Sequence, residues 1–80
     1  MRALSPLERQ ACDVLSACAS FPEPLFGFGY YTESAARALG YDMDAARLAE
    51  QALDAEAACS MFDARLWYAD GEARIRSGWR

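Results

Sequence analysis

The sequence predicts a small α+β domain with three helices, a C-terminal β-hairpin and a short third strand between the first two helices. Two observations lead to this prediction. Apolar residues recur at helical spacing through much of the chain, and an Asp-Gly dipeptide at residues 70–71 separates two strand-like runs. With 80 residues, the chain is near the lower size limit for one hydrophobic core and is too short for a second domain.

The first helix is predicted over residues 6–19. Ser5, Pro6 and Glu8 supply three signals of a helix start: an N-cap, a proline at the first helical position and a capping-box carboxylate. Prolines follow at positions 22 and 24 and begin a loop, because proline lacks the amide that a helix needs. One face of the helix is apolar and predicted to be buried: Leu7, Ala11, Val14, Leu15 and Cys18.

The middle of the chain predicts a strand and two further helices. Aromatic residues alternate with glycine in LFGFGYY, which favours a short strand over residues 28–31. Thr32 is placed to cap a helix over 33–39 that ends at Gly40. Asp42 then caps a longer third helix, in which Glu50 and Asp54 face solvent. Its buried stripe comprises Ala45, Leu48, Ala52, Ala55, Cys59 and Phe62.

The end of the chain predicts a β-hairpin. Asp70-Gly71 suits a two-residue type I′ turn, and strand-like sequence flanks it on both sides. In the resulting register Trp67 lies opposite Arg74, which permits a cation–π contact. The buried face of the hairpin comprises Leu66, Tyr68, Ala73 and Ile75, and the other face carries Arg65, Trp67, Glu72, Arg74 and Arg76.

The order of these elements resembles a winged-helix domain. The stretch YYTESAARALGYDMDAARLAEQAL is similar to its helix-turn-helix core, with Ala36, Gly40 and Leu53 at matching spacings. The resemblance covers residues 6–76 and implies, as one alternative, a transcriptional regulator that reads DNA. Its contacts would come mainly from an Arg-rich wing: Arg65, Arg74, Arg76 and Arg80.

The charge distribution favours a different function. The chain has eight Arg, no Lys and no His against twelve acids, which gives a net charge of -4. Residues 40–63 occupy the position of a DNA-reading helix, yet six acids and one arginine leave them with a net charge of -5. Phosphate binding requires cations, so we expect the protein not to bind nucleic acid directly.

Enzymatic and metal-dependent functions find little support in the sequence. Without His or Lys, the chain lacks the commonest general base and all amine chemistry. Cys12 and Cys18 have no His or second Cys at the spacing of metal ligands, and we expect reduced thiols. We expect no secretory signal, and no apolar run in the sequence approaches the roughly 20 residues that span a bilayer. The sequence therefore predicts a monomeric cytoplasmic protein that is not an enzyme and needs no cofactor.

The acidic segment predicts a protein partner, although such charges also suit a solvated surface that maintains solubility. Helical residues four apart are separated by about 6 Å along the axis, and phosphates of one DNA strand by about 3.4 Å. The acids would therefore mimic DNA in a groove lined by Arg or Lys. A very small acidic domain of this kind resembles the anti-CRISPR proteins of phages and mobile elements. The resemblance implies an inhibitor of a type I CRISPR effector complex in the host bacterial cell. The predicted contacts are Asp44, Glu50, Asp54, Glu56, Asp63 and Trp67.

Overall fold

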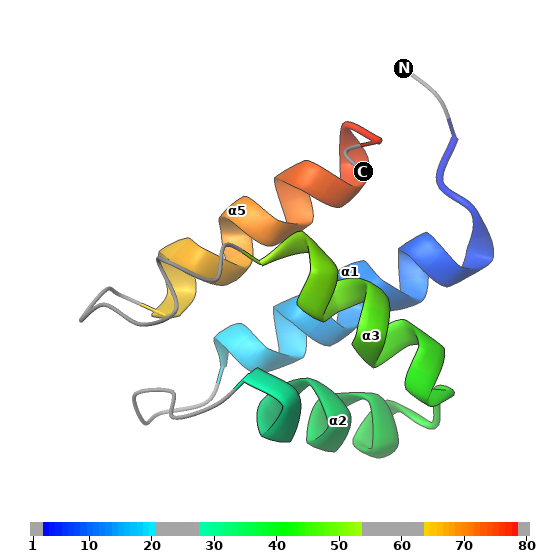
Figure 1. Ribbon diagram of the computed structural model, residues 1–80, viewed down its shortest axis with the longest axis vertical. Helices are drawn as coiled ribbons and strands as arrows, with labels where there is room; N and C mark the ends of the chain where they lie inside the picture. The colour runs from blue at the N-terminus through cyan, green and yellow to red at the C-terminus, as the bar shows by residue number, and fades with distance from the viewer. Residues whose placement is uncertain (1–2, 21–27, 54–63, 79–80) are drawn as a thin grey trace.

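The described part of the chain is helical. The computed structural model describes residues 3–20, 28–53 and 64–78, and its helices are α1 (Pro6–Ala19), α2 (Phe28–Leu39), α3 (Met43–Ala52) and α5 (Ala64–Arg76) (Figure 1). None of the residues in these ranges forms a β-strand. The predicted α+β class is therefore wrong. The resemblance to a winged-helix domain falls with it, because that fold requires the C-terminal hairpin.

Helix α1 begins where the sequence predicts it. The Ser5 hydroxyl accepts a hydrogen bond from the Glu8 amide, the Glu8 carboxylate accepts one from the Ser5 amide, and both distances are 3.1 Å. This capping box satisfies two amides at the open end of the helix and leaves Glu8 only 3% exposed. Most of the predicted apolar face is buried. Leu7 is the exception, and Cys12 joins the core.

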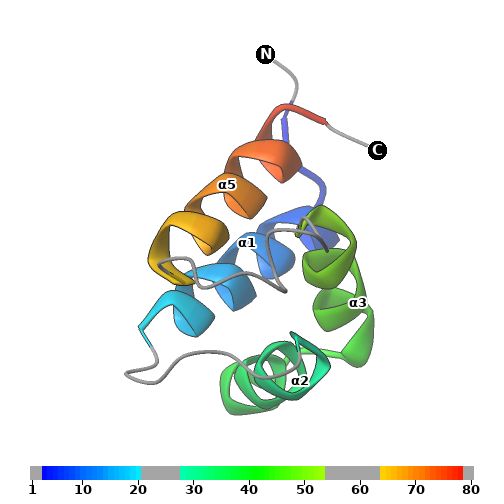
Figure 2. The same cartoon turned by 60° about the vertical axis from the view of Figure 1, so that its left-hand side comes forward.

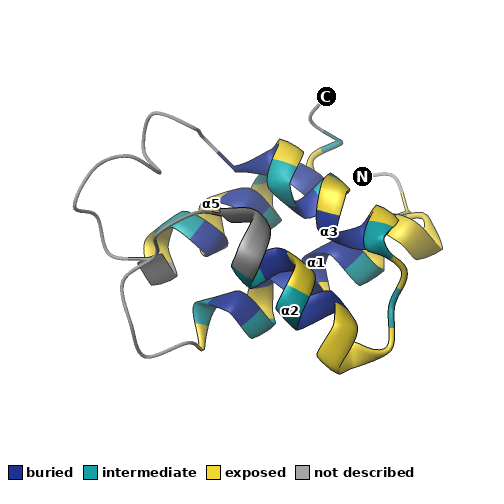
Figure 3. Cartoon of the chain, turned by 60° about the horizontal axis from the view of Figure 1, so that its bottom comes forward, coloured by how far each residue is buried: buried dark blue, intermediate teal, exposed yellow. Residues whose placement is uncertain are grey.

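Helix α1 contacts the other three described helices. Helix α5 runs antiparallel beside it, α2 packs against α1 and α3, and α3 also contacts α5 (Figures 1 and 2). Buried residues occur on each of the four helices (Figure 3). The buried hydrophobic core comprises Ala11, Cys12, Val14, Leu15, Cys18, Ala35, Ala36, Ala45, Ala46, Ala49, Ala52, Leu53, Tyr68 and Ile75.

A glycine-dependent turn joins α2 to α3. Gly40 has a φ angle of +77°, in the left-handed region that residues with a Cβ rarely adopt. The Tyr41 amide donates to the Ala36 carbonyl at 2.9 Å, and the Gly40 amide donates to the Arg37 carbonyl at 3.1 Å. These two bonds form a Schellman motif. They confirm the predicted glycine at the end of the helix and fix the direction in which the chain enters α3.

Helix α2 begins earlier than the sequence predicts. The predicted strand over 28–31 is wrong, because these residues form the first turn of α2. Thr32 was expected to cap the helix, but it lies inside it and is fully buried. Gly29 costs about 1 kcal/mol of helix propensity relative to alanine. Packing of α2 on α1 and α3 outweighs this local preference.

Alanine lines the buried side of α3. Ala45, Ala46, Ala49 and Ala52 are each at most 1% exposed, whereas the predicted core residue Leu48 is only half-buried. Short side chains let the helix approach its neighbours closely. The helix ends at Ala52 because Leu53 adopts an extended backbone, with φ −81° and ψ 145°. The sequence predicted a longer helix, whose residues Ala55, Cys59 and Phe62 lie outside the described residues.

The predicted hairpin is replaced by helix α5. Asp70 and Gly71 lie within the helix, so the predicted turn and strand register are wrong. Gly71 is buried against α1 and the end of α3, where a Cβ would lie 3.2 Å from Leu15 Cδ1 and 3.1 Å from Leu53 Cδ2. The missing side chain therefore permits this close packing.

The buried face of α5 overlaps only partly with that predicted for the hairpin. Tyr68 and Ile75 are in the core, seven residues apart, as one face of a helix requires. Leu66 is 70% exposed and Ala73 is also exposed, although both were expected to be buried.

Candidate interaction surface

Asp44 is exposed, as the sequence predicts for a docking residue. It lies in the first turn of α3, and its Oδ1 is 3.1 Å from Nη1 of Arg47. The side chains of Asp44 and Arg47 are 66% and 72% exposed. Such pairs contribute little to stability, so Asp44 remains accessible to a cationic partner. Three other predicted contacts, Asp54, Glu56 and Asp63, lie outside the described residues.

Glu50 is half-buried and does not lie on an open solvent face. The buried Thr32 hydroxyl donates a hydrogen bond to Glu50 Oε1 at 2.7 Å, which links α2 to α3. The expectation that Glu50 faces solvent is therefore wrong. The periodicity of α3 alone could not reveal this contact, since its partner belongs to a different helix.

Replacing Glu50 with arginine is expected to lower the free energy of unfolding by about 1–3 kcal/mol, since it removes an acceptor from a buried hydroxyl. Glu50→Gln keeps an acceptor oxygen at the same position, and we expect it to cost less than about 1 kcal/mol. Urea unfolding followed by circular dichroism measures both variants. If Glu50→Arg is as stable as the wild type, the contact with Thr32 contributes nothing.

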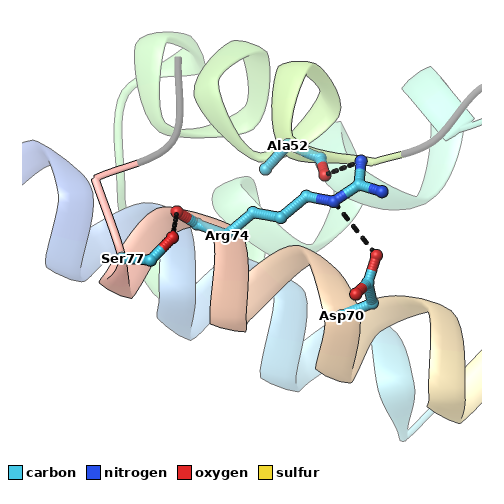
Figure 4. Close-up of polar contacts among 4 residues, drawn as sticks. All are labelled: Ala52, Asp70, Arg74 and Ser77. Carbon is cyan, nitrogen blue, oxygen red and sulfur yellow. Dashed lines mark hydrogen bonds and ion pairs between the residues drawn. The ribbon is translucent and has the colours of Figure 1, made fainter.

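Helix α5 separates Trp67 from Arg74, which the hairpin would have placed face to face. Trp67 is half-buried and packs edge-on against Tyr68, with ring centroids 6.4 Å apart and an interplanar angle of 77°. The Arg74 guanidinium donates to the Ala52 carbonyl at 3.2 Å and pairs with Asp70 at 3.1 Å (Figure 4). Arg74 thereby satisfies a carbonyl at the end of α3. This arginine, assigned to a DNA-contacting wing from the sequence, holds two helices together.

The turn between α2 and α3 presents two acidic residues to solvent. Asp42 occupies the N-cap position of α3 with an extended backbone, but its side chain makes no capping hydrogen bond. Asp44 follows in the first turn, where the positive end of the helix dipole stabilises a carboxylate. Both residues are exposed, and the turn around them is largely exposed as well (Figure 3).

A third carboxylate, that of Asp13, lies beside this turn and is hydrogen-bonded to Tyr41. The Tyr41 hydroxyl donates a hydrogen bond of 2.7 Å to Asp13 Oδ2 on the exposed side of α1. We refer to Asp13, Tyr41, Asp42 and Asp44 together as the acidic corner. The sequence gives no sign of the Tyr41–Asp13 contact, because 28 residues separate the partners and each looks like an ordinary surface position.

The hydrogen bond to Asp13 also changes the chemistry of Tyr41. Donating this bond to Asp13, together with desolvation and the negative charge of Asp13, favours the protonated phenol and raises the pKa of Tyr41. Tyr41 therefore remains a hydrogen-bond donor throughout the neutral pH range.

Cys12 and Cys18 are buried free thiols, in agreement with the reduced state expected from the sequence. Burial raises the pKa of Cys18 from 9.0 to about 12 and also raises the pKa of Cys12. A thiol nucleophile must be deprotonated, so neither group is activated at neutral pH.

Stability is expected to decrease as the pH rises above about 9. Cys12, Cys18 and Tyr68 have raised pKa values in the folded protein, mainly because they are buried. The unfolded chain releases these protons at lower pH than the folded chain does, so higher pH favours unfolding. Urea midpoints between pH 7 and 11 test this, and Cys18→Ala should flatten the decline. A midpoint that stays constant from pH 8 to 11 would contradict the burial of these groups.

The described residues offer neither a metal site nor a membrane-spanning helix. Within those ranges, no cluster of three or more His, Cys, Asp or Glu side chains is arranged to hold a metal ion. None of the described helices combines the length and apolar character that crossing a membrane requires.

No protein-family model matches the chain, and comparisons with curated proteins and with solved structures likewise give no significant match.

Proposed function

We propose that the protein is a small acidic inhibitor that docks its acidic corner into the basic groove where a type I CRISPR effector complex holds nucleic acid. One observation carries the proposal. The Asp42 carboxylate is exposed at the N-cap of α3 and makes no capping hydrogen bond. An N-cap aspartate ordinarily uses its side chain to accept a backbone amide. Here the charge remains available to a partner.

The charge of the chain supports a cationic partner. The net charge is -4, and the corner contributes to it the carboxylates of Asp13, Asp42 and Asp44, of which Asp44 pairs with Arg47. A surface of one sign speeds encounter with a surface of the opposite sign and disfavours like-charged partners such as DNA. A groove lined by Arg or Lys offers the required complement, because it binds phosphates in its normal function.

The class of target is taken from the resemblance to anti-CRISPR proteins in size and charge. In this proposal the protein acts by occupying the groove and uses no catalytic group or cofactor. Asp54, Glu56, Asp63 and Trp67 remain predicted contacts. Glu50 contributes less than the sequence suggests, because its carboxylate is engaged with Thr32.

Binding to immobilised type I effector complexes tests the proposal. The variant Asp42→Asn with Asp44→Asn removes two charges from the corner and keeps a good N-cap residue. We expect it to bind about tenfold more weakly at low salt, if each exposed charge contributes roughly 0.5–1 kcal/mol. The matched control, Asp70→Asn with Glu72→Gln, removes the same amount of charge from α5 and should keep most of the wild-type affinity. Its urea midpoint is measured first, because Asp70 pairs with Arg74 and Glu72 accepts a hydrogen bond from Ser16. Failure of the wild type to bind any such complex would overturn the proposal.

The isolated protein is expected not to shift duplex DNA at moderate salt, because its net charge repels phosphates. A mobility-shift titration of duplex DNA with the protein, in the absence of any effector complex, measures this directly. Sequence-selective binding to DNA would contradict the assignment of a protein partner and would require a cationic surface that the described residues do not suggest.

A further inference from the structure

We draw no further inference here: the strongest candidate, the exposed apolar face of α5 formed by Leu66, Ala69 and Ala73, carries nothing because no feature of the described part of the chain shows what covers it.

Discussion

Replacing Gly71 with valine is expected to lower the free energy of unfolding by about 3 kcal/mol. Even a single added Cβ would lie 3.1 Å from Leu53 Cδ2 and 3.2 Å from Leu15 Cδ1, closer than ordinary van der Waals contact. Leu15 is completely buried and cannot retreat towards solvent. Valine adds two further methyl groups, so the Leu15 and Leu53 side chains or α5 itself must shift to make room. Urea unfolding followed by circular dichroism at 222 nm measures the loss.

A matched control for Gly71→Val is Ala73→Val in the same helix. Ala73 is exposed, so this change reports only the lower helix propensity of valine and should cost less than about 1 kcal/mol. Equal effects of the two variants would contradict the packing of Gly71. A hairpin at this position would give a different pattern, since Ala73→Val would then favour the strand.

Replacing Tyr68 with alanine is expected to cost about 3–5 kcal/mol, because it removes a large and fully buried side chain from the core. A chain of this length is stabilised by roughly 4–12 kcal/mol in total. Tyr68→Ala should therefore leave the protein largely unfolded or very close to unfolding. Far-UV circular dichroism and the urea midpoint measure the effect.

Tyr68→Phe is the control for Tyr68→Ala, because it removes the hydroxyl and keeps the ring. The Tyr68 hydroxyl is buried and has no hydrogen bond of ordinary geometry among the described residues, although the Cys18 thiol next to it contributes to its raised pKa. Sulfur is a weak acceptor, so removing the hydroxyl should be neutral or stabilising by up to about 1 kcal/mol. A loss of more than about 1 kcal/mol would show that the hydroxyl has a strong partner.

Local sequence signals were sufficient for α1 and for the turn into α3. The capping box of α1 involves only Ser5 and Glu8, and both are within one turn of each other. Gly40 adopts its left-handed conformation within a motif of six consecutive residues. Such features depend on neighbours in the chain, and the sequence therefore predicts them without knowledge of tertiary packing.

The same kind of signal was misleading at Asp70-Gly71. The dipeptide favours a tight turn, and a short apolar run fits a period of two almost as well as a period of 3.6. A local signal does not report the packing of α5 on α1 and α3, where the absence of a Cβ at Gly71 leaves room for Leu15 and Leu53. The ion pair between Asp70 and Arg74 further supports the helix.

The candidate surface, like the fold, was predicted from the sequence only in part. The exposure of Asp44 follows from its place at the start of a helix. Glu50 and Asp13 could not be assigned correctly, because their roles depend on Thr32 and Tyr41, which lie on other segments. Sequence periodicity gives the face of a helix, but it does not show which neighbouring element covers that face.

The proposed function is tested most directly by measuring whether this protein and target DNA exclude each other on a purified type I CRISPR effector complex. Labelled target DNA is titrated with the complex at several fixed concentrations of the protein. Occupation of the groove predicts that the apparent Kd for DNA rises in proportion to the protein concentration, and that the rise is smaller for Asp42→Asn with Asp44→Asn. A ternary complex with unchanged DNA affinity, or no association at all, would contradict it.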